Sequence, residues 1–157
     1  MLNNRTNRKL LPHIPPFWIA ENAIFFITIN CQKQGENQLA NEGMAKSLID
    51  SWLFYRDQGK CAPLLVLVMP DHLHLLVSFS WDIGEGMSAL VKSWKRFTAK
   101  QNGIQWQRNY FDHRIRNEDS FHQKWDYIIN NPVSAGLTND PDNWPHKWIS
   151  PHAEYSE

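Results

Sequence analysis

Two histidines lie one residue apart in the segment Pro-Asp-His-Leu-His-Leu-Leu-Val, residues 70–77. Side chains alternate between the two faces of a β-strand, so a strand here places His72 and His74 on one face and the neighbouring aliphatic side chains on the other. Two imidazoles on one face supply half of the ligands of a typical metal site. Because His-x-His also occurs without metal, the pair alone leaves a structural role open.

The second group capable of chemistry is Tyr127, which lies in a predicted helix more than fifty residues downstream. An apolar stripe at helical spacing should pack this helix on a sheet, and it consists of Phe121, Trp125, Ile128 and Ile129. Tyr127 lies outside the stripe, on a face shared with Lys124 and Asn131. The alternative is a tyrosine that only covers the polar flank of the helix.

Local signals delimit this helix. It is expected to open near Asn117–Ser120, where Ser120 and Gln123 have capping-box spacing. Pro132 disfavours helical geometry at the preceding residue, so the helix is expected to end at Asn131.

Together, Pro-Asp-His-Leu-His-Leu-Leu-Val and the later Tyr-Ile-Ile-Asn-Asn-Pro-Val-Ser-Ala-Gly-Leu resemble the REP-associated tyrosine transposases, relatives of the single-tyrosine HUH transposases. The resemblance extends over roughly residues 20–150 and rests on two motifs in the right order at domain-scale separation. It implies that His72 and His74 are metal ligands, that Asn131 is a third, amide-type ligand and that Tyr127 is the nucleophile. No second tyrosine shares the helix face of Tyr127, as in single-tyrosine enzymes.

The resemblance also implies a reaction, a cofactor and a substrate. These enzymes use Mg²⁺ or Mn²⁺ and cut single-stranded DNA beside imperfect palindromes folded as hairpins, typically repeated extragenic palindromes (REP). The strand becomes attached through a 5′-phosphotyrosine and is later transferred. Relatives occur as monomers and as homodimers that exchange the tyrosine helix, and nothing in the residues decides between these states.

Elementary chemistry agrees with these roles. A phenol has an ordinary pKa of about 10, so it is a poor nucleophile at neutral pH without help from a cation or a base. A divalent ion with open positions would bind a phosphate oxygen and orient the scissile phosphodiester for in-line attack. Because the bond energy is kept in the covalent link, no nucleoside triphosphate is required, and the sequence contains no Gly-x-x-x-x-Gly-Lys-Ser/Thr motif.

The charge pattern gives a local signal for nucleic acid. The 157 residues include 16 basic and 16 acidic side chains, so net charge argues neither way. Between residues 91 and 116, seven basic side chains accompany a single acidic one, Asp112. The candidate phosphate contacts are Arg5, Arg8, Lys92, Lys95, Arg96, Lys100, Arg108, Arg114 and Arg116. For any one of them, a solvated surface position is the alternative.

The remaining elements predict a single domain with a ferredoxin-like fold. Strands are expected at 23–30, 64–68, 72–77 and 107–115, and helices at 41–58 and 88–101. The inner face of the second helix should carry Leu90, Val91, Trp94 and Phe97. The order β-α-β-β-α-β is the split βαβ arrangement, an α+β antiparallel sheet, here with an additional C-terminal helix carrying the tyrosine. The histidines should face away from the first two helices.

Around this domain, at residues 22–137, we expect an irregular basic arm at residues 1–21 and an irregular Trp- and Pro-rich tail at residues 138–157. Two cysteines without CxxC spacing, and no apolar run long enough for a membrane span, favour a cytoplasmic protein without membrane association.

Other functional classes remain compatible with parts of the sequence. A domesticated or inactive ferredoxin-like nucleic-acid-binding protein, or an RNA-binding module, would use the basic segment but neither the histidine pair nor Tyr127. A metal-dependent hydrolase would use the histidines to activate water and would form no covalent adduct.

Overall fold

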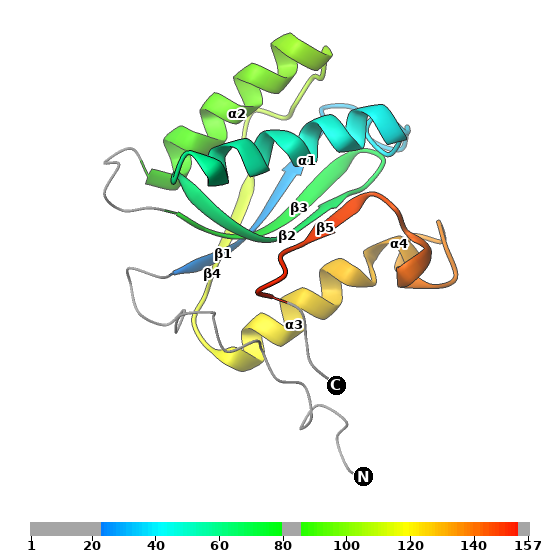
Figure 1. The fold of residues 1–157 in the computed structure, drawn as a ribbon. Helices are drawn as coiled ribbons and strands as arrows, with labels where there is room; N and C mark the ends of the chain where they lie inside the picture. Colours follow the sequence, from blue (N-terminus) through cyan, green and yellow to red (C-terminus); the bar gives the residue numbers. More distant parts are fainter. Residues whose placement is uncertain (1–22, 80–85, 154–157) are drawn as a thin grey trace.

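An antiparallel sheet forms the centre of the protein (Figure 1). The computed structural model describes residues 23–79 and 86–153. Within these residues the sheet has five strands in the order β4-β1-β3-β2-β5. The strands are β1 (Ile24–Asn30), β2 (Cys61–Val68), β3 (His72–Phe79), β4 (Phe111–Ile115) and β5 (Lys147–Ile149). The strand that carries the two histidines therefore lies in the middle of the sheet.

Helices cover both faces of the sheet. Figure 1 shows α1 (Glu42–Asp57) and α2 (Gly86–Asn102) on one face and α3 (Glu118–Ile129) on the other. Helix α1 begins as expected, because the Asn41 side chain accepts a hydrogen bond from the Met44 N–H. The first four strands with α1 and α2 have the predicted β-α-β-β-α-β order, and α3 is the additional helix that carries Tyr127.

The pleat of the sheet separates two apolar cores. On the α1 and α2 side, Leu73, Leu75 and Val77 of β3 pack with residues such as Trp52 and Trp94. The core on the α3 side contains Phe26, Leu65, Leu67, Leu76, Phe121, Trp125 and Ile128. His72 and His74 alternate with the first set, so they face α3, as the sequence predicted.

The inner face of α2 differs from the prediction at one position. Phe97 is 53% exposed, whereas the adjacent Thr98 is buried. The Thr98 hydroxyl donates to the Trp94 carbonyl and accepts a hydrogen bond from the Trp106 indole N–H at 2.9 Å. This pairing orients the helix so that Thr98 enters the core and Phe97 points outward.

The fourth strand is shorter than predicted. It begins at Phe111 rather than near Gln107, because the ammonium of Lys95 binds the carbonyls of Gln107 and Arg108 at 2.6 and 2.8 Å. The Lys95 side chain therefore occupies two carbonyls that a longer β4 would need for pairing. Regular pairing with β1 begins only after them, at Phe111.

The ends of α3 also differ in detail. The N-cap is Asn117, whose side chain accepts from the Ser120 N–H at 2.8 Å, so Ser120 lies inside the first turn rather than capping it. The helix ends at Ile129, and a short helix, α4 (Asn131–Ser134), follows at once with Pro132 in its first turn. Proline is compatible with that position because the first N–H groups of a helix lack intrahelical partners.

Residues 138–153 are more regular than the expected tail. After a short 3-10 helix, η4 (Pro141–Asn143), β5 pairs antiparallel with the edge of β2, with Leu65 opposite Ile149. The Trp144 indole donates to the Val68 carbonyl at 3.0 Å. Cross-strand pairing with β2 brings these residues into the sheet. No local pattern in this segment predicted that pairing.

The proposed arm at residues 1–21 and the end of the chain from residue 154 lie outside the described residues. Among the helices that the structure describes, none combines the length and the apolar character required to cross a bilayer.

The two apolar cores predict unequal effects of phenylalanine truncation. Phe121 is fully buried between α3 and the sheet, so Phe121→Ala should lower the free energy of unfolding by about 3–5 kcal/mol. Phe97→Ala, at a position 53% exposed, should change it by no more than about 0.5 kcal/mol. Urea denaturation of both variants checks this, and equal losses would contradict the placement of Phe97.

Candidate metal and tyrosine site

The two imidazoles lie against each other beneath α3. The ring centroids of His72 and His74 are 4.8 Å apart, with the ring planes at 76°. His74 is buried, whereas His72, the first residue of β3, is half-buried. The pleat of β3 therefore brings both rings to one small region, as their spacing predicted.

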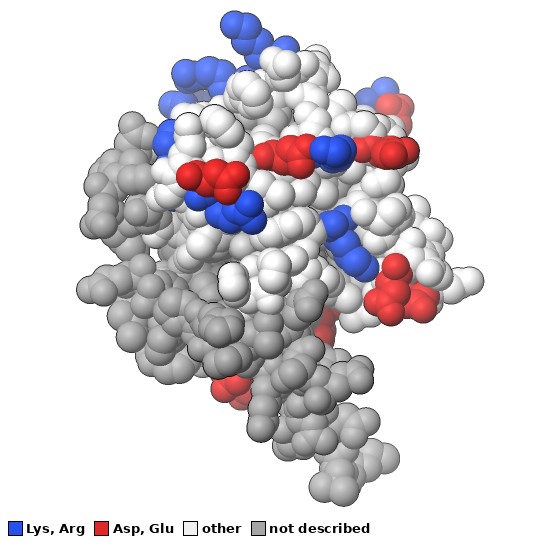
Figure 2. All heavy atoms as spheres, viewed as in Figure 1, with Lys and Arg blue, Asp and Glu red and all other residues white. Residues whose placement is uncertain are grey.

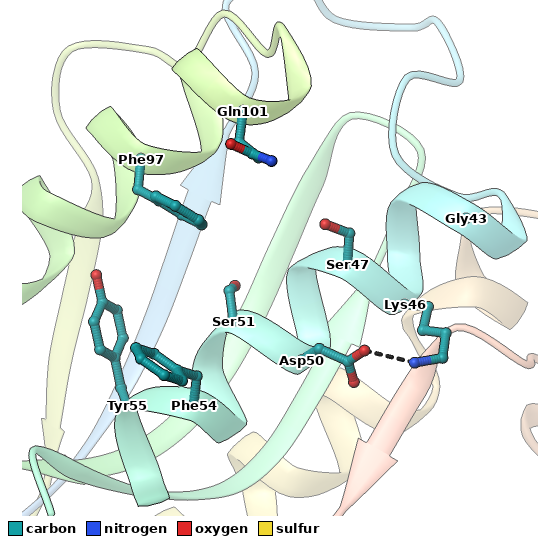
Figure 3. Close-up of a pocket in the computed structure, with 9 residues that line it drawn as sticks. All are labelled: Gly43, Lys46, Ser47, Asp50, Ser51, Phe54, Tyr55, Phe97 and Gln101. Atoms are coloured by element: carbon teal, nitrogen blue, oxygen red, sulfur yellow. Dashed lines mark hydrogen bonds and ion pairs between the residues drawn. The ribbon is translucent and has the colours of Figure 1, made fainter. Parts of the chain in front are cut away.

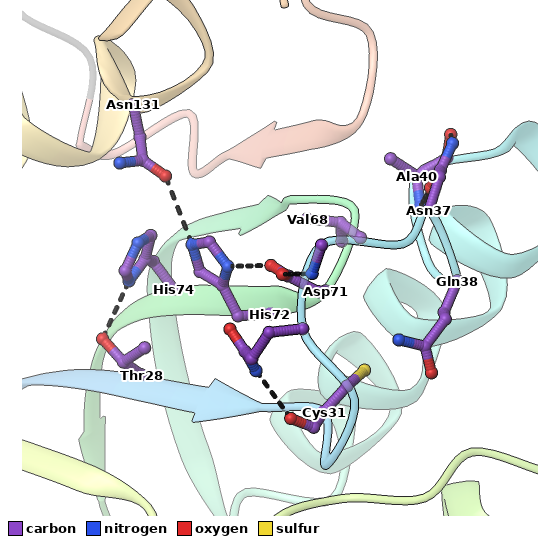
Figure 4. Close-up of polar contacts among 12 residues, drawn as sticks. Thr28, Cys31, Asn37, Gln38, Ala40, Val68, Asp71, His72, His74 and Asn131 are labelled. Carbon is purple, nitrogen blue, oxygen red and sulfur yellow. Dashed lines mark hydrogen bonds and ion pairs between the residues drawn. The ribbon is translucent and has the colours of Figure 1, made fainter. Parts of the chain in front are cut away.

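Asp71 orients His72. Its carboxylate accepts a hydrogen bond from Nδ1 of His72 at 2.7 Å and another from the Gly35 N–H at 2.8 Å (Figure 4). Burial raises the pKa of the Asp71 carboxyl, but these hydrogen bonds and the neighbouring His72 outweigh it and hold the pKa below its ordinary value. An ionised carboxylate only accepts, so Nδ1 of His72 carries a proton, and in the neutral form of this imidazole the lone pair is on Nε2.

Thr28 orients His74 in the same way. The two residues are opposite each other in the β1–β3 ladder, and the Thr28 hydroxyl lies 2.9 Å from Nδ1 of His74 (Figure 4). When the hydroxyl accepts from Nδ1–H, the lone pair of Nε2 is free. No described residue makes a hydrogen bond to this buried Nε2 atom.

Burial also keeps His74 uncharged. Desolvation, followed by the nearby charge of His72, lowers the pKa of His74 to about 3. Asn131 lies close enough to oppose this shift, although no hydrogen bond of good geometry joins it to His74. A neutral imidazole with an unshared lone pair is the form that binds a metal ion.

Asn131 faces the histidines from α4. Its side-chain oxygen lies 3.3 Å from Nε2 of His72, although 59 positions separate the residues (Figure 4). Neighbouring donor atoms around an octahedral Mg²⁺ lie about 3.0 Å apart, because each is about 2.1 Å from the ion. The separation of the His72 Nε2 and Asn131 oxygen atoms is close to this spacing, so the two could be neighbouring ligands of a divalent ion.

A metal site here would depend on the amide. Within the described residues, no three His, Cys, Asp or Glu side chains gather in a group that could hold a metal ion. If the two imidazoles held a metal ion, the amide oxygen of Asn131 would be a third candidate protein ligand, and further positions would be left for water or a phosphate oxygen.

Tyr127 lies beside His74. Its ring centroid is 5.7 Å from that of His74 and 6.0 Å from that of Phe26, and the side chain is 54% exposed. The ammonium of Lys124, one turn earlier on α3, lies 5.0 Å from the centre of the Phe26 ring. A solvent-accessible phenol, a cation and two imidazoles thus meet over one part of the sheet.

Most of the predicted phosphate contacts lie elsewhere. Lys92, Arg96 and Lys100 project from α2, on the opposite side of the sheet from α3, and Figure 2 shows basic side chains gathered over this helix at the top of the view. The ammonium of Lys95 is already bound to two carbonyls. The structure does not bring these residues to the histidines.

The other predicted contacts are dispersed. Arg108 is exposed in the loop before β4, and Arg116 is exposed just after β4, near the start of α3. Arg114 is half-buried and lies opposite Phe25, which packs on the α1 and α2 side. Arg5 and Arg8 lie outside the described residues.

A separate pocket of about 680 Å³ lies between α1 and α2 (Figure 3). Exposed Phe54 and Phe97 line it, and its charged groups, Lys46 and Asp50, are paired at 2.6 Å. It is on the other side of the sheet from Tyr127 and offers no group arranged for catalysis.

Two curated proteins are similar in sequence to about half of this chain. An Escherichia coli (strain K12) REP-associated tyrosine transposase is 32% identical over 85 residues, covering 50% of this chain and 48% of that protein. A Haemophilus influenzae (strain ATCC 51907 / DSM 11121 / KW20 / Rd) protein, provisionally given the same name, is 27% identical over 97 residues, covering 52% of this chain and 54% of that protein. No family model matches the chain.

The fold is also that of a solved relative. The structure of a REP-associated tyrosine transposase bound to a REP hairpin superposes with a TM-score of 0.71 at 20% identity, covering 87% of each chain. The resemblance to the REP-associated tyrosine transposases is confirmed. The sequence matches span about half the length of these curated relatives.

Sequence reasoning missed several residues of this candidate site. No role in the site was assigned to Asp71, although it directly precedes His72. Thr28 was not considered, because its partner His74 is 46 positions away in the sequence. Lys124 was noted on the face of Tyr127 without a role. Its spacing of three from the tyrosine is the local signal that could have identified it.

The buried His74 predicts a pH dependence of stability. Because its pKa is lowered from 6.5 to about 3, the unfolded chain binds a proton that the folded protein does not between these values. The contribution of His74 to the free energy of unfolding is therefore full above pH 6.5, the pKa in the unfolded chain, and is lost as the pH falls toward about 3, the pKa in the folded protein. The metal-free protein should therefore lose up to about 1.4 kcal/mol per pH unit from this group.

His74→Gln provides the comparison, because it cannot titrate. Urea unfolding in chelator from about pH 7 to about pH 4 should give a steeper decline for the original chain than for the variant. Parallel curves would show that His74 is not held neutral.

Proposed function

We propose that this chain is a metal-dependent single-strand DNA endonuclease and strand transferase that cuts hairpin-associated DNA through a covalent 5′-phosphotyrosine. The observation that carries the proposal is the meeting of a solvent-accessible Tyr127 with the unpartnered, buried Nε2 of His74. The fold shared with a hairpin-bound REP-associated tyrosine transposase supports the choice of a hairpin substrate. We further propose that the protein acts in the cytoplasm, as a monomer or a homodimer.

His72, His74 and Asn131 would hold Mg²⁺ or Mn²⁺. When bound, the ion would supply positive charge to a non-bridging phosphate oxygen of the scissile bond. The protein would contribute orientation, because Asp71 and Thr28 contact the Nδ1 atoms of the two imidazoles and would leave both Nε2 atoms for the ion. An uncharged His74 would not repel the metal ion. The ion could then attract the anionic phosphate of the DNA.

Tyr127 would form the covalent bond. Its phenolic oxygen attacks phosphorus while the bond from phosphorus to the 3′ oxygen of the neighbouring nucleotide breaks. The phenol loses a proton, and the departing 3′ oxygen gains one. Exposure of 54% lets the phenol exchange its proton with water, and the position of α3 over β3 holds its ring against that of His74.

Lys124 would contact the DNA beside the scissile bond. It extends from the same face of α3 as Tyr127, and its ammonium lies over Phe26, which also contacts the His74 and Tyr127 rings. A cation in this position can bind the neighbouring phosphate of a strand lying across the site.

A covalent-adduct assay tests the proposal. The protein is incubated with Mn²⁺ and single-stranded oligonucleotides that carry a hairpin with unpaired flanks, and the products are separated on a denaturing gel. We expect a protein–DNA adduct that Tyr127→Phe abolishes, because the variant keeps the ring but has no nucleophilic oxygen. Tyr55→Phe, on the other side of the sheet, is the matched control and should form the adduct normally.

Other outcomes identify the rival functions. Free fragments without an adduct, unaffected by Tyr127→Phe, would indicate a hydrolase. Bound but intact DNA would indicate a nucleic-acid-binding protein that does not cleave.

The orientation of His74 predicts an effect on metal affinity. Thr28→Val keeps the shape of the side chain but removes the acceptor for Nδ1, so Mn²⁺ affinity should fall by about 10- to 100-fold. Tyr127→Phe should leave the affinity unchanged, since the tyrosine is not a ligand. Calorimetric titration with Mn²⁺ measures both, and an unaltered affinity in Thr28→Val would contradict the proposed arrangement.

A further inference from the structure

Phe111 is an exposed aromatic side chain beside the tyrosine site. It is 54% exposed at the start of β4 and belongs to neither apolar core. Within the described residues, β4 is the edge strand of the sheet on the β1 side, so no strand covers it from outside. Edge strands are usually short or carry charged side chains, so a large exposed ring there is unexpected for stability alone.

The sheet register places this ring on the same face as the histidines. Thr28 of β1 lies opposite both Phe111 of β4 and His74 of β3. Directly opposed residues project from the same face, so Phe111, Thr28 and His74 form one row across three strands. Two strand spacings, about 10 Å, separate the ends of this row.

Aromatic contacts connect the ends of the row. Phe26 contacts Phe111 with ring centroids 6.0 Å apart, and it contacts His74 at 5.4 Å and Tyr127 at 6.0 Å. The ammonium of Lys124 lies 5.0 Å from the same Phe26 ring. An apolar surface with one cation beside it thus extends from the candidate nucleophile to the exposed ring of Phe111.

We infer that Phe111 stacks on an unpaired DNA base flanking the cleavage site and so positions the single strand across the sheet. This inference rests on the proposed function and adds a residue that contacts the substrate. Unpaired bases stack on exposed aromatic rings, and a nearby cation binds the backbone that joins them. A base-paired stem exposes no such base face, so the contact favours the unpaired flank over the hairpin stem.

Binding measurements with defined DNA test the inference. The probe is a fluorescein-labelled DNA hairpin with an unpaired thymidine flank, compared by fluorescence anisotropy in chelator with the same hairpin carrying an abasic flank. Phe111→Leu retains an apolar contact with Phe26 but has no aromatic face, so we expect about tenfold weaker binding of the thymidine flank. Phe111→Trp should bind at least as tightly as the original chain.

Two comparisons make the result specific. Phe97→Leu, at a residue 53% exposed on the opposite side of the sheet, should leave binding unchanged. The original chain should bind the abasic flank more weakly than the thymidine flank, and Phe111→Leu should bind the two alike. Unaltered affinity in Phe111→Leu, or an undiminished preference for the thymidine flank, would overturn the inference.

The adduct assay separates this inference from the proposed function. Adduct formation through Tyr127 together with no effect of Phe111→Leu on binding would leave the endonuclease proposal intact and refute the stacking role. A base-dependent loss of binding in Phe111→Leu without any adduct would support the stacking role and refute cleavage. Failure of the original chain to bind the thymidine flank would refute both.

Discussion

The packing of α3 on the sheet is the contact on which the rest of the site depends. Its apolar stripe, which includes Phe121 and Ile128, is buried against the same sheet face that carries the histidines. Once this stripe is buried, helical geometry places Tyr127 on the exposed flank above His74, and the turn after α3 directs Asn131 to His72. Burial of hydrocarbon, rather than polar attraction, therefore determines where the reactive groups lie.

The polar contacts around the imidazoles add a second constraint. Each Nδ1 atom has a hydrogen-bond partner, Asp71 for one ring and Thr28 for the other. When both partners accept, the lone pairs of the neutral rings are on the two Nε2 atoms. Gly35, with φ of 82°, brings its N–H to Asp71 and ties the loop after β1 to the orientation of His72. A buried nitrogen without a partner raises the energy of the site until it gains a ligand.

Periodicity explains most of the agreement between sequence and structure. Alternation predicted that His72 and His74 share a face, and helical spacing predicted that Tyr127 lies outside the stripe of α3. It was wrong for Phe97, because the hydrogen bond from Trp106 to Thr98 decides which side of α2 is buried. It also predicted too early a start for β4, because Lys95 binds carbonyls that a longer strand would have paired with its neighbour.

By itself the sequence determined most of the elements and the α+β order, because local backbone geometry is carried by each short segment. The resemblance of its two motifs to a known family singled out the histidine pair, the tyrosine and the amide. The tertiary structure alone decided that Thr28 would pair with His74, that Phe111 would lie in their row, and that α2 with its basic residues would lie on the sheet face opposite α3. Such relations depend on strand register and on which face each helix covers, and these are decided only when distant segments pack together.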